Sequence, residues 1–400
     1  MYASKPTFIV KKNMQKSLET GVYFDDQVTP AILEDVCNRI LGTKECDIQF
    51  VDNNFSNEDI SATYNKGRTA FLYYKNAINI ISFSEINING RNSSVQSVPT
   101  AFNLFFNNNK QEKNLYYYFL DANGNIETSY HHFIYRLMAT VGFQFLNSEK
   151  LIDSIIPFSS LPDLMLARRI NSGRNQSNNP TYITKNSSKE IDLYGKTYGA
   201  SKYETSLLCY AISNIANRTK QNINLYQVAE GNLQILPQSS LSVIEKMNNI
   251  KLIQADMILE RKAFAENDRL RSPKYIYNLL DRLGPKKCAF CDCRIPEIIQ
   301  GAHILPVSRI KQNNLLSFEQ KLQHATDGHN GLWLCENHHK LFDENIININ
   351  LNGKLVIDPH IASDDKMFIE KITTNYSLAS EILTDEFIEY LNQRNSVINF

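Results

Sequence analysis

Three short stretches in the last third of the chain decide how the sequence is interpreted. They read CAFC at 288–291, GAHILP at 301–306 and GHNGLWLCENHHK at 328–340. Together they gather cysteine, histidine and asparagine at short spacings. Cysteine and histidine bind soft metals, and histidine also exchanges protons near neutral pH. The region is therefore the first candidate for a metal-dependent catalytic site.

Two pairs of potential ligands, C-x2-C and C-x2-H, predict a closed tetrahedral zinc site. Each two-residue spacer lets one tight turn present both side chains to the same ion. Cys293 offers an alternative thiolate, and free thiols beside an unrelated surface histidine are the competing interpretation. The four expected ligands of a structural Zn²⁺ are Cys288, Cys291, Cys335 and His338.

A second pattern overlaps the first and consists of His303, Asn330 and His339. Hydrolysis of a phosphodiester needs a base that activates water and a divalent cation that neutralises charge at the scissile phosphate. A neutral imidazole suits the base, a second imidazole can hold Mg²⁺ or Mn²⁺, and an amide can fix the loop between them. Asp343, one helical turn after His339, is a candidate second ligand of this cation, and a structural carboxylate is the alternative.

The identity and order of these residues resemble the HNH endonucleases, also called ββα-metal nucleases, in their zinc-knuckle variant. The resemblance implies that a first strand ends in the general base His303. It also implies that Asn330 fixes the loop before a second strand, and that a short helix presents the metal ligand His339. Two features depart from many relatives: Ala302 stands where an acidic metal ligand is common, and an insertion occupies Ser308 to Asp327.

The composition indicates a multidomain globular protein with balanced charge. Of 400 residues, 42% are hydrophobic and 21% are charged, and 42 Lys+Arg face 42 Asp+Glu. Because the total is balanced, any DNA-binding surface must be a local basic patch. The sequence has neither a secretory signal nor an apolar stretch long enough to span a membrane. We therefore expect a cytoplasmic protein with reduced thiols and no membrane partner.

The chain is expected to be an α+β protein with three consecutive parts. Residues 1–170 are expected to form a mixed α/β domain for DNA recognition or dimerisation, and residues 171–270 a basic linker and helical region. Residues 271–400 are expected to form the ββα-metal nuclease domain with its structural zinc, closed by a C-terminal helix.

Local patterns also predict individual elements. Strand formers predict strands at 69–74 and 78–83, and Asn123-Gly124 predicts a hairpin after the strand at 115–120. A loop is expected over 171–190, and a hairpin is expected to join 346–350 to 354–358 across Asn352-Gly353. Helices are expected from Ser129, from about Glu204, over much of 240–268, between N-cap Ser272 and Gly284, and from about Thr384.

A basic stretch and the insertion supply the candidate DNA contacts. Residues 166–220 hold nine Lys/Arg against three acidic residues, and such a stretch can contact phosphates and base edges. A solvated surface is the competing interpretation for each residue, and the insertion is either a DNA-contacting loop or a plain surface helix. The expected contacts are Arg168, Arg169, Arg174, Lys196, Lys202, Arg309, Lys311 and Lys340.

The whole chain resembles bacterial type II restriction endonucleases with a C-terminal HNH domain. This resemblance rests on the architecture and on a weaker likeness at YGKTYGA, residues 194–200. It implies sequence-specific cleavage of double-stranded DNA, a homodimer matched to a palindromic site, and a cognate methyltransferase in the host. The alternatives are a modification-dependent, nicking or homing-type HNH nuclease, and a catalytically inactive, zinc-stabilised DNA-binding protein, which only Ala302 supports.

Overall fold

The computed structural model of the chain describes residues 3–12, 27–52, 54–60, 68–87, 91–108, 112–121, 124–172, 181–185, 190–195, 202–228, 238–247, 249–255, 257–266 and 272–396. The chain folds into two compact units and enters each of them more than once. Unit 1 comprises Met1–Asn179, Thr197–Gln221 and Asn232–Ile250. Unit 2 comprises Pro180–Lys196, Asn222–Gly231 and Lys251–Phe400.

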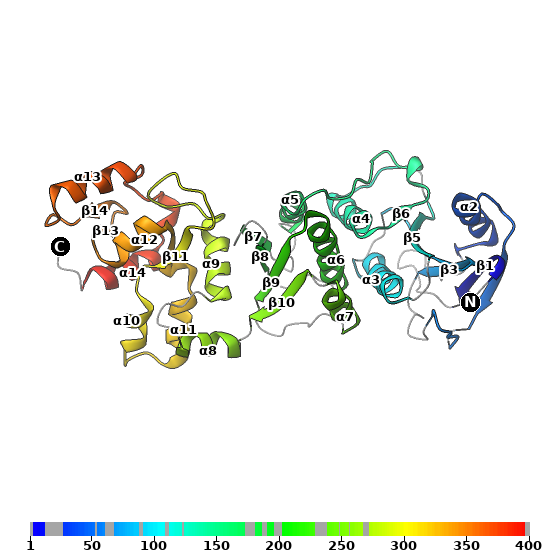
Figure 1. Cartoon of the computed structure of the whole chain (residues 1–400), viewed down its shortest axis with the longest axis horizontal. Helices are drawn as coiled ribbons and strands as arrows, with labels where there is room; N and C mark the ends of the chain where they lie inside the picture. Colours follow the sequence, from blue (N-terminus) through cyan, green and yellow to red (C-terminus); the bar gives the residue numbers. More distant parts are fainter. Residues whose placement is uncertain are drawn as a thin grey trace. The chain divides into compact units, whose positions relative to one another are not determined.

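Unit 1 contains a six-stranded mixed sheet in the order β2-β1-β3-β4-β5-β6. Figure 1 labels β1, β3, β5 and β6 of this sheet. The neighbours β1 and β2, β4 and β5, and β5 and β6 are parallel, whereas β3 is antiparallel to β1 and β4. The strands are β1 Ala3–Lys11, β2 Asp47–Val51, β3 Thr69–Lys75, β4 Ala77–Ser84, β5 Glu112–Phe119 and β6 Gln144–Phe145. The helices of this unit are α2 Pro30–Leu41, α3 Arg91–Asn107, α4 Ser129–Val141, the 3-10 helix η2 Ser148–Lys150, α5 Leu161–Ser172, α6 Lys202–Thr219 and α7 Gln238–Lys246.

Most predicted elements of unit 1 are confirmed. β3 and β4 occupy the two predicted strand segments, and α6 covers the helix expected from about Glu204. Helix α4 begins after Thr128, whose side chain accepts a hydrogen bond from the backbone N–H of His131, and its inner face is buried. The apolar stripe of Phe133, Leu137 and Val141 at helical spacing therefore predicts this helix, and Thr128 caps its start.

The hairpin predicted at Asn123-Gly124 is wrong. β5 pairs in parallel with β4 and β6, and parallel neighbours are joined by crossover connections rather than tight turns. Asn123 lies outside the described residues, and Gly124 forms one isolated bridge with Leu151. Long-range pairing with β4 and β6, and not the local Asn-Gly signal, therefore determines the neighbours of β5.

Unit 2 combines a four-stranded sheet, in the order β10-β9-β8-β7, with two small hairpins and several helices (Figure 1). The strands are β7 Thr181–Lys185, β8 Glu190–Gly195, β9 Asn222–Val228, β10 Ile250–Ala255, β11 Ile299–His303, β12 Gly331–Cys335, β13 Ile347–Ile349 and β14 Leu355–Ile357. The helices are α8 Met257–Glu266, α9 Pro273–Leu283, α10 Val307–Gln312, α11 Phe318–Thr326, the 3-10 helix η3 Gly328–Asn330, α12 Glu336–Asp343, α13 Ser363–Ile372, the 3-10 helix η4 Ser380–Ile382 and α14 Asp385–Asn395.

Two predictions in the middle of the chain are wrong. Residues 181–185, expected in a loop, form β7 and pair with β8. The helix expected over much of 240–268 is interrupted by β10, which separates α7 from α8. Ile250 and Ile253 are β-branched and suit a strand beside β9, so pairing outweighs the apolar spacing that resembled a helix.

Predictions for the C-terminal part are confirmed, because their signals are local. Ser272 caps α9 by accepting a hydrogen bond from the backbone N–H of Tyr275, and Gly284 ends the helix at φ 73°. β13 and β14 pair across Gly353, which also has φ 73°. Helix α14 begins after N-cap Thr384. Within the described ranges, no helix has the length and apolar character needed to cross a bilayer.

Candidate active site and metal centre

Three cysteines and one histidine form a compact ligand cluster in unit 2. The ligand atoms of Cys288, Cys291, Cys335 and His338 all lie within 4.8 Å of one another. His338 Nδ1 is 3.6 Å from Cys288 Sγ and 3.2 Å from Cys335 Sγ, and the Sγ atoms of Cys291 and Cys335 are 3.8 Å apart. Zinc–ligand bonds of about 2.0–2.3 Å in a tetrahedron give ligand separations of this size. The cluster could therefore hold a zinc ion.

The surroundings orient His338 toward the sulfur atoms. Thr373 Oγ1 donates its proton to the carbonyl of Ile369, so it must accept a hydrogen bond from His338 Nε2, 3.1 Å away. The lone pair of the neutral ring is then on Nδ1, on the side of the cysteines. Hydrogen bonding with Cys335 lowers the pKa of Cys288, whereas the contact with Cys288 and burial raise the pKa of Cys335 to about 11. A bound cation would favour the thiolate form of all three cysteines.

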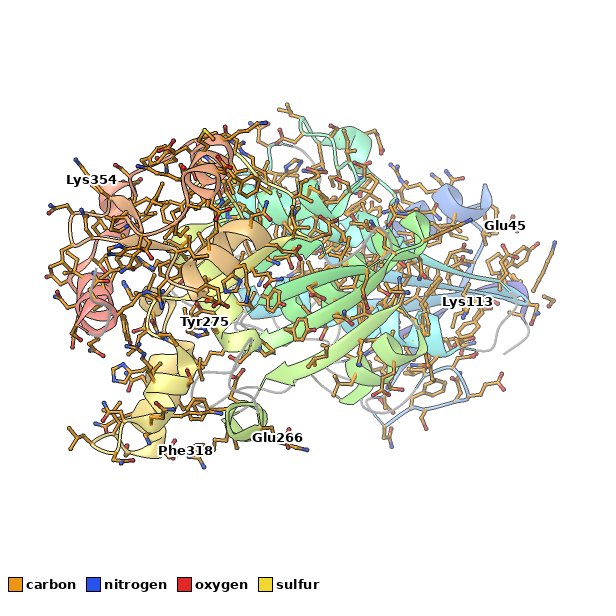
Figure 2. All side chains as sticks on the ribbon, turned by 60° about the vertical axis from the view of Figure 1, so that its left-hand side comes forward. Glu45, Lys113, Glu266, Tyr275, Phe318 and Lys354 are labelled. Atoms are coloured by element: carbon orange, nitrogen blue, oxygen red, sulfur yellow. The ribbon has the colours of Figure 1, made fainter. Side chains whose placement is uncertain are left out.

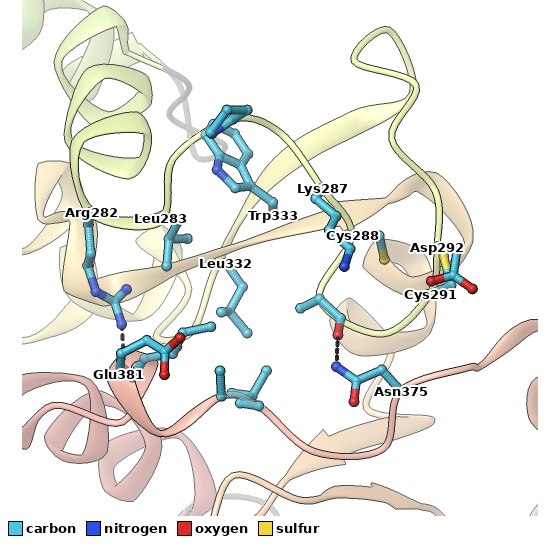
Figure 3. Close-up of a pocket in the computed structure, with 15 residues that line it drawn as sticks. Arg282, Leu283, Lys287, Cys288, Cys291, Asp292, Leu332, Trp333, Asn375 and Glu381 are labelled. Carbon is cyan, nitrogen blue, oxygen red and sulfur yellow. Dashed lines mark hydrogen bonds between the residues drawn. The ribbon is translucent and has the colours of Figure 1, made fainter. Parts of the chain in front are cut away.

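A cavity of about 370 Å³ lies beside this cluster (Figure 3). Residues 285–292, which include Cys288 and Cys291, line one side, and the end of α9, β12 and residues 375–382 supply the rest. Figure 3 shows Leu332 and Trp333 of β12 on its wall. Among the described residues that line it, none belongs to the pattern formed by His303, Asn330 and His339. The cavity is therefore not the predicted catalytic centre.

His303 is the last residue of β11 and is held on two sides. Its Nε2 lies 2.9 Å from the carbonyl oxygen of Ala325 in α11. Its ring is stacked on the ring of Tyr275, with 4.0 Å between centroids and 9° between planes. A carbonyl oxygen only accepts hydrogen bonds, so Nε2 carries the proton of the neutral ring. Nδ1 is then the ring atom with the lone pair that can accept a proton.

Asn330 is completely buried and bonds three backbone groups. Its Oδ1 accepts from the backbone N–H of Leu305 at 2.7 Å, and its Nδ2 donates to the carbonyls of Leu305 and His324, each at 3.1 Å. Leu305 is only two residues after His303. The amide therefore ties the chain that follows the histidine to the loop before β12.

His339 and Asp343 face each other on α12. His339 Nε2 lies 3.6 Å from Asp343 Oδ2, a separation at which both atoms can bind one cation. His339 Nδ1 lies 3.2 Å from Oε1 of Gln300 in β11. Since an amide oxygen only accepts, Nδ1 carries the proton and Nε2 presents its lone pair toward Asp343. Sequence reasoning missed Gln300, because this contact between strand and helix leaves no spacing signal.

The described residues contain no other group of three His, Cys, Asp or Glu side chains placed to share an ion. Ala302, buried in β11, contributes no ligand where many relatives have an acid. A cation bound at His339 and Asp343 would therefore take its remaining ligands from water and a substrate phosphate. The carboxylate, water and phosphate oxygens would suit a hard divalent cation such as Mg²⁺ or Mn²⁺.

A buried arginine from the C-terminal helix connects the two halves of this site. Arg394 of α14 donates from Nη1 to the carbonyl of Ile304 at 3.1 Å and from Nη2 to the carbonyl of Phe342. Ile304 follows His303, and Phe342 precedes Asp343. One guanidinium thus fixes the end of β11 against α12. Burial lowers the pKa of Arg394 to about 10, so the side chain stays charged at neutral pH.

The predicted DNA contacts have different surroundings. Arg168 is only 6% exposed, so it is not placed to bind a phosphate. Lys311 Nζ lies 5.2 Å from the ring centroid of Phe264, and Arg309 is half-buried on the same helix, α10. The side chain of Lys340 is 71% exposed and pairs with Glu344. Arg169 and Lys202 lie in α5 and α6, without described side chains, and the described residues do not include Arg174 and Lys196.

Comparison with known proteins agrees with this geometry in the C-terminal region. Residues 288–350 match the family described as HNH endonuclease. None of the curated proteins matches the chain. The matched residues contain the four-ligand cluster, both strands of the β11–β12 hairpin and α12, and nucleases of this kind use a divalent metal and act on DNA. The chain therefore carries a C-terminal HNH endonuclease domain.

Proposed function

We propose that this protein is a sequence-specific double-stranded DNA endonuclease, a type II restriction enzyme with a one-metal HNH mechanism. One observation carries the proposal. An imidazole at the end of β11 and a His–Asp pair on α12 belong to one ββα unit, and Arg394 bonds to the backbone beside both of them. We propose that a scissile phosphodiester binds at the end of β11 and contacts both groups.

His303 is the proposed general base. Its Nε2 proton is held by the carbonyl of Ala325, so Nδ1 removes a proton from a water molecule as the water oxygen attacks phosphorus. The bond from phosphorus to the leaving oxygen breaks, and that oxygen takes a proton from solvent. The same carbonyl stabilises the imidazolium that forms, because it accepts a hydrogen bond from a charged donor. Asn330 keeps the backbone after His303 in place during this step.

His339 and Asp343 are the proposed protein ligands of Mg²⁺ or Mn²⁺. When bound, the ion supplies positive charge at the scissile phosphate and the leaving oxygen. His339 presents Nε2 because Gln300 accepts the proton of Nδ1. The Cys288–His338 cluster supports the proposed assignment of a structural Zn²⁺, since it lies at the base of the same hairpin and helix.

Target selection is assigned to the parts of the chain outside the HNH domain, and the basic excess of residues 166–220 supports this division. Arg309, Lys311 and Lys340 are proposed to contact the DNA backbone near the cut. A homodimer is proposed because two active sites related by a two-fold axis match a palindromic site. A cognate methyltransferase would protect the DNA of the bacterial host.

The test is digestion of unmodified and methylated plasmid by the full-length chain with Mg²⁺, followed by sequencing of the ends. Discrete fragments with one recurring end sequence from unmodified DNA are expected. Cleavage confined to methylated DNA, or to one strand, would replace the proposal with a modification-dependent or nicking nuclease. Binding without cleavage would indicate an inactive DNA-binding protein. Light scattering that finds a monomer with DNA bound would contradict the dimer.

A further inference from the structure

Helix α9 ends just before the matched HNH region and contributes a buried tyrosine to the site. We propose that Tyr275 is a positioning residue, which holds the imidazole of His303 in the orientation needed to accept a proton. This inference rests on the proposed function and adds a residue to its site. Tyr275 belongs to unit 2 and is labelled in Figure 2.

The ring of Tyr275 contacts the ring of His303 face to face. At 4.0 Å between centroids and 9° between planes, the phenol ring lies parallel to the imidazole and covers one of its faces. Tyr275 is itself fully buried and therefore cannot move aside easily. The hydrogen bond to Ala325 fixes the ring edge, and the stacking fixes the ring plane. Together these two contacts define the direction in which Nδ1 points.

The hydroxyl group of the same tyrosine contacts the backbone of both strands of the hairpin. It donates toward the carbonyl of Ala302 at 3.1 Å and lies 3.4 Å from the carbonyl of Asn330. These residues precede His303 on β11 and Gly331 on β12, two positions that pair across the hairpin. Tyr275 therefore contacts the ring of His303, the backbone just before His303, and the backbone just before the residue that pairs with it.

Two glycines, Gly301 in the GAH motif and Gly331 in the NGL motif, leave room for the side chains of α9. A Cβ atom at Gly331 would lie 2.2 Å from Tyr275 Oη. A Cβ atom at Gly301 would lie 2.5 Å from Leu279 Cδ1 and 3.1 Å from Tyr275 Cε1. Both glycines are needed for α9 to approach the hairpin so closely. The glycines of both motifs therefore leave the space that the side chain of Tyr275 occupies.

The rest of α9 fixes the loop that the tyrosine faces. Asn278 Nδ2 donates to the carbonyl of Thr326 at 2.7 Å, and Arg282 Nη1 donates to the carbonyls of Gly328 and Gly331 at 2.8 and 3.1 Å. These bonds hold the loop independently of Tyr275. Replacing the tyrosine ring should therefore change the orientation of His303 more than the overall fold.

The expected effect is on the chemical step. A displacement of about 1 Å in a reacting group can lower a rate by roughly 10²-fold. The face of a tyrosine ring also attracts a cationic ring, so the stacking favours the imidazolium formed in the reaction. Tyr275→Phe keeps the ring face and loses the hydroxyl, whereas Tyr275→Leu loses the ring face. We expect Tyr275→Leu to be the slower variant by at least about tenfold.

The experiment measures single-turnover cleavage of supercoiled plasmid with Mg²⁺ and full-length enzyme in excess, and plasmid affinity with Ca²⁺. The expected result is a rate at least tenfold lower for Tyr275→Leu at unchanged affinity, with most of the rate restored in Tyr275→Phe. Zinc content and thermal midpoint check folding, and Tyr275→Met replaces the leucine variant if that protein does not fold. Equal rates for wild type and Tyr275→Leu, or equal losses in Tyr275→Phe and Tyr275→Leu, would overturn the inference.

A matched control separates this inference from the proposed function. His303→Ala should lower the single-turnover rate by about 10²–10⁴-fold if His303 is the base. If His303→Ala is inactive and Tyr275→Leu cleaves normally, only the role of Tyr275 is refuted. If His303→Ala cleaves like wild type, the proposed HNH mechanism with His303 as base fails, and the role of Tyr275 fails with it.

Discussion

Removal of the Asn330 side chain is expected to weaken both the stability and the activity of the HNH domain. Asn330→Ala deletes three hydrogen bonds, at 2.7, 3.1 and 3.1 Å, from a fully buried position. Each buried backbone group left without its partner costs about 1–3 kcal/mol, and the costs overlap because the groups share one loop. We therefore expect the free energy of unfolding to fall by about 3–5 kcal/mol. Release of the chain after His303 should lower the single-turnover rate by roughly 10²-fold.

Urea denaturation followed by tryptophan fluorescence measures the first quantity, because Trp333 lies on β12, directly after Asn330. Asn330→Asp is an informative second variant. Its carboxylate still accepts from Leu305, but its other oxygen faces two carbonyls, so it should be no more stable than Asn330→Ala at neutral pH. Asn352→Ala, at an exposed turn of the same domain, is the control and should change stability by less than about 0.5 kcal/mol. An Asn330→Ala protein within 1 kcal/mol of wild type that cleaves at the wild-type rate would refute the reasoning.

Three further predictions concern the metals and one buried acid. Gln300→Ala should weaken Mn²⁺ binding, measured by electron paramagnetic resonance, by about 10–100-fold. Gln300→Glu should bind Mn²⁺ like wild type, because the glutamate still accepts the hydrogen bond from Nδ1 of His339. Equal Mn²⁺ affinity in wild type and Gln300→Ala would contradict the assigned tautomer of His339. Mass spectrometry should find about one zinc ion per chain in the wild type and almost none in Cys335→Ala. A wild-type protein that contains no zinc after purification would contradict the assignment of the cluster as a zinc site. Burial raises the pKa of Asp192 in the folded state, so its ionisation destabilises the fold as pH rises above about 4. Asp192→Asn should therefore unfold at higher urea concentration than wild type at pH 7 and at a similar concentration at pH 3, and lower stability of this variant at pH 7 would show that the carboxylate is stabilising.

Local signals explain why the HNH region could be predicted from the sequence. The zinc ligands come in pairs two residues apart, the helices begin at Ser272 and Thr384 with capping side chains, and Gly353 marks a turn. Each of these signals acts within a few residues. The order of strand, strand and helix is implied by the resemblance to HNH endonucleases, and the structure has β11, β12 and α12 in that order.

Contacts between distant segments explain what could not be predicted. Gln300, Tyr275 and Arg394 reach the site from a strand, from a helix before the HNH match and from the C-terminal helix, and their spacing in the sequence reveals none of this. The pairing of β5 with β4 and β6 overrode a local turn signal for the same reason. Arg168 illustrates the converse: a basic stretch predicts charge, but tertiary packing buried this arginine.

The central claim is that the imidazole of His303 activates water at a phosphodiester. Single-turnover cleavage of plasmid DNA by His303→Ala, with Mg²⁺ and enzyme in excess, tests it most directly. The rate should fall by about 10²–10⁴-fold, while affinity for the same plasmid in Ca²⁺ and the zinc content stay at wild-type values. A His303→Ala protein that cleaves at the wild-type rate would contradict the claim.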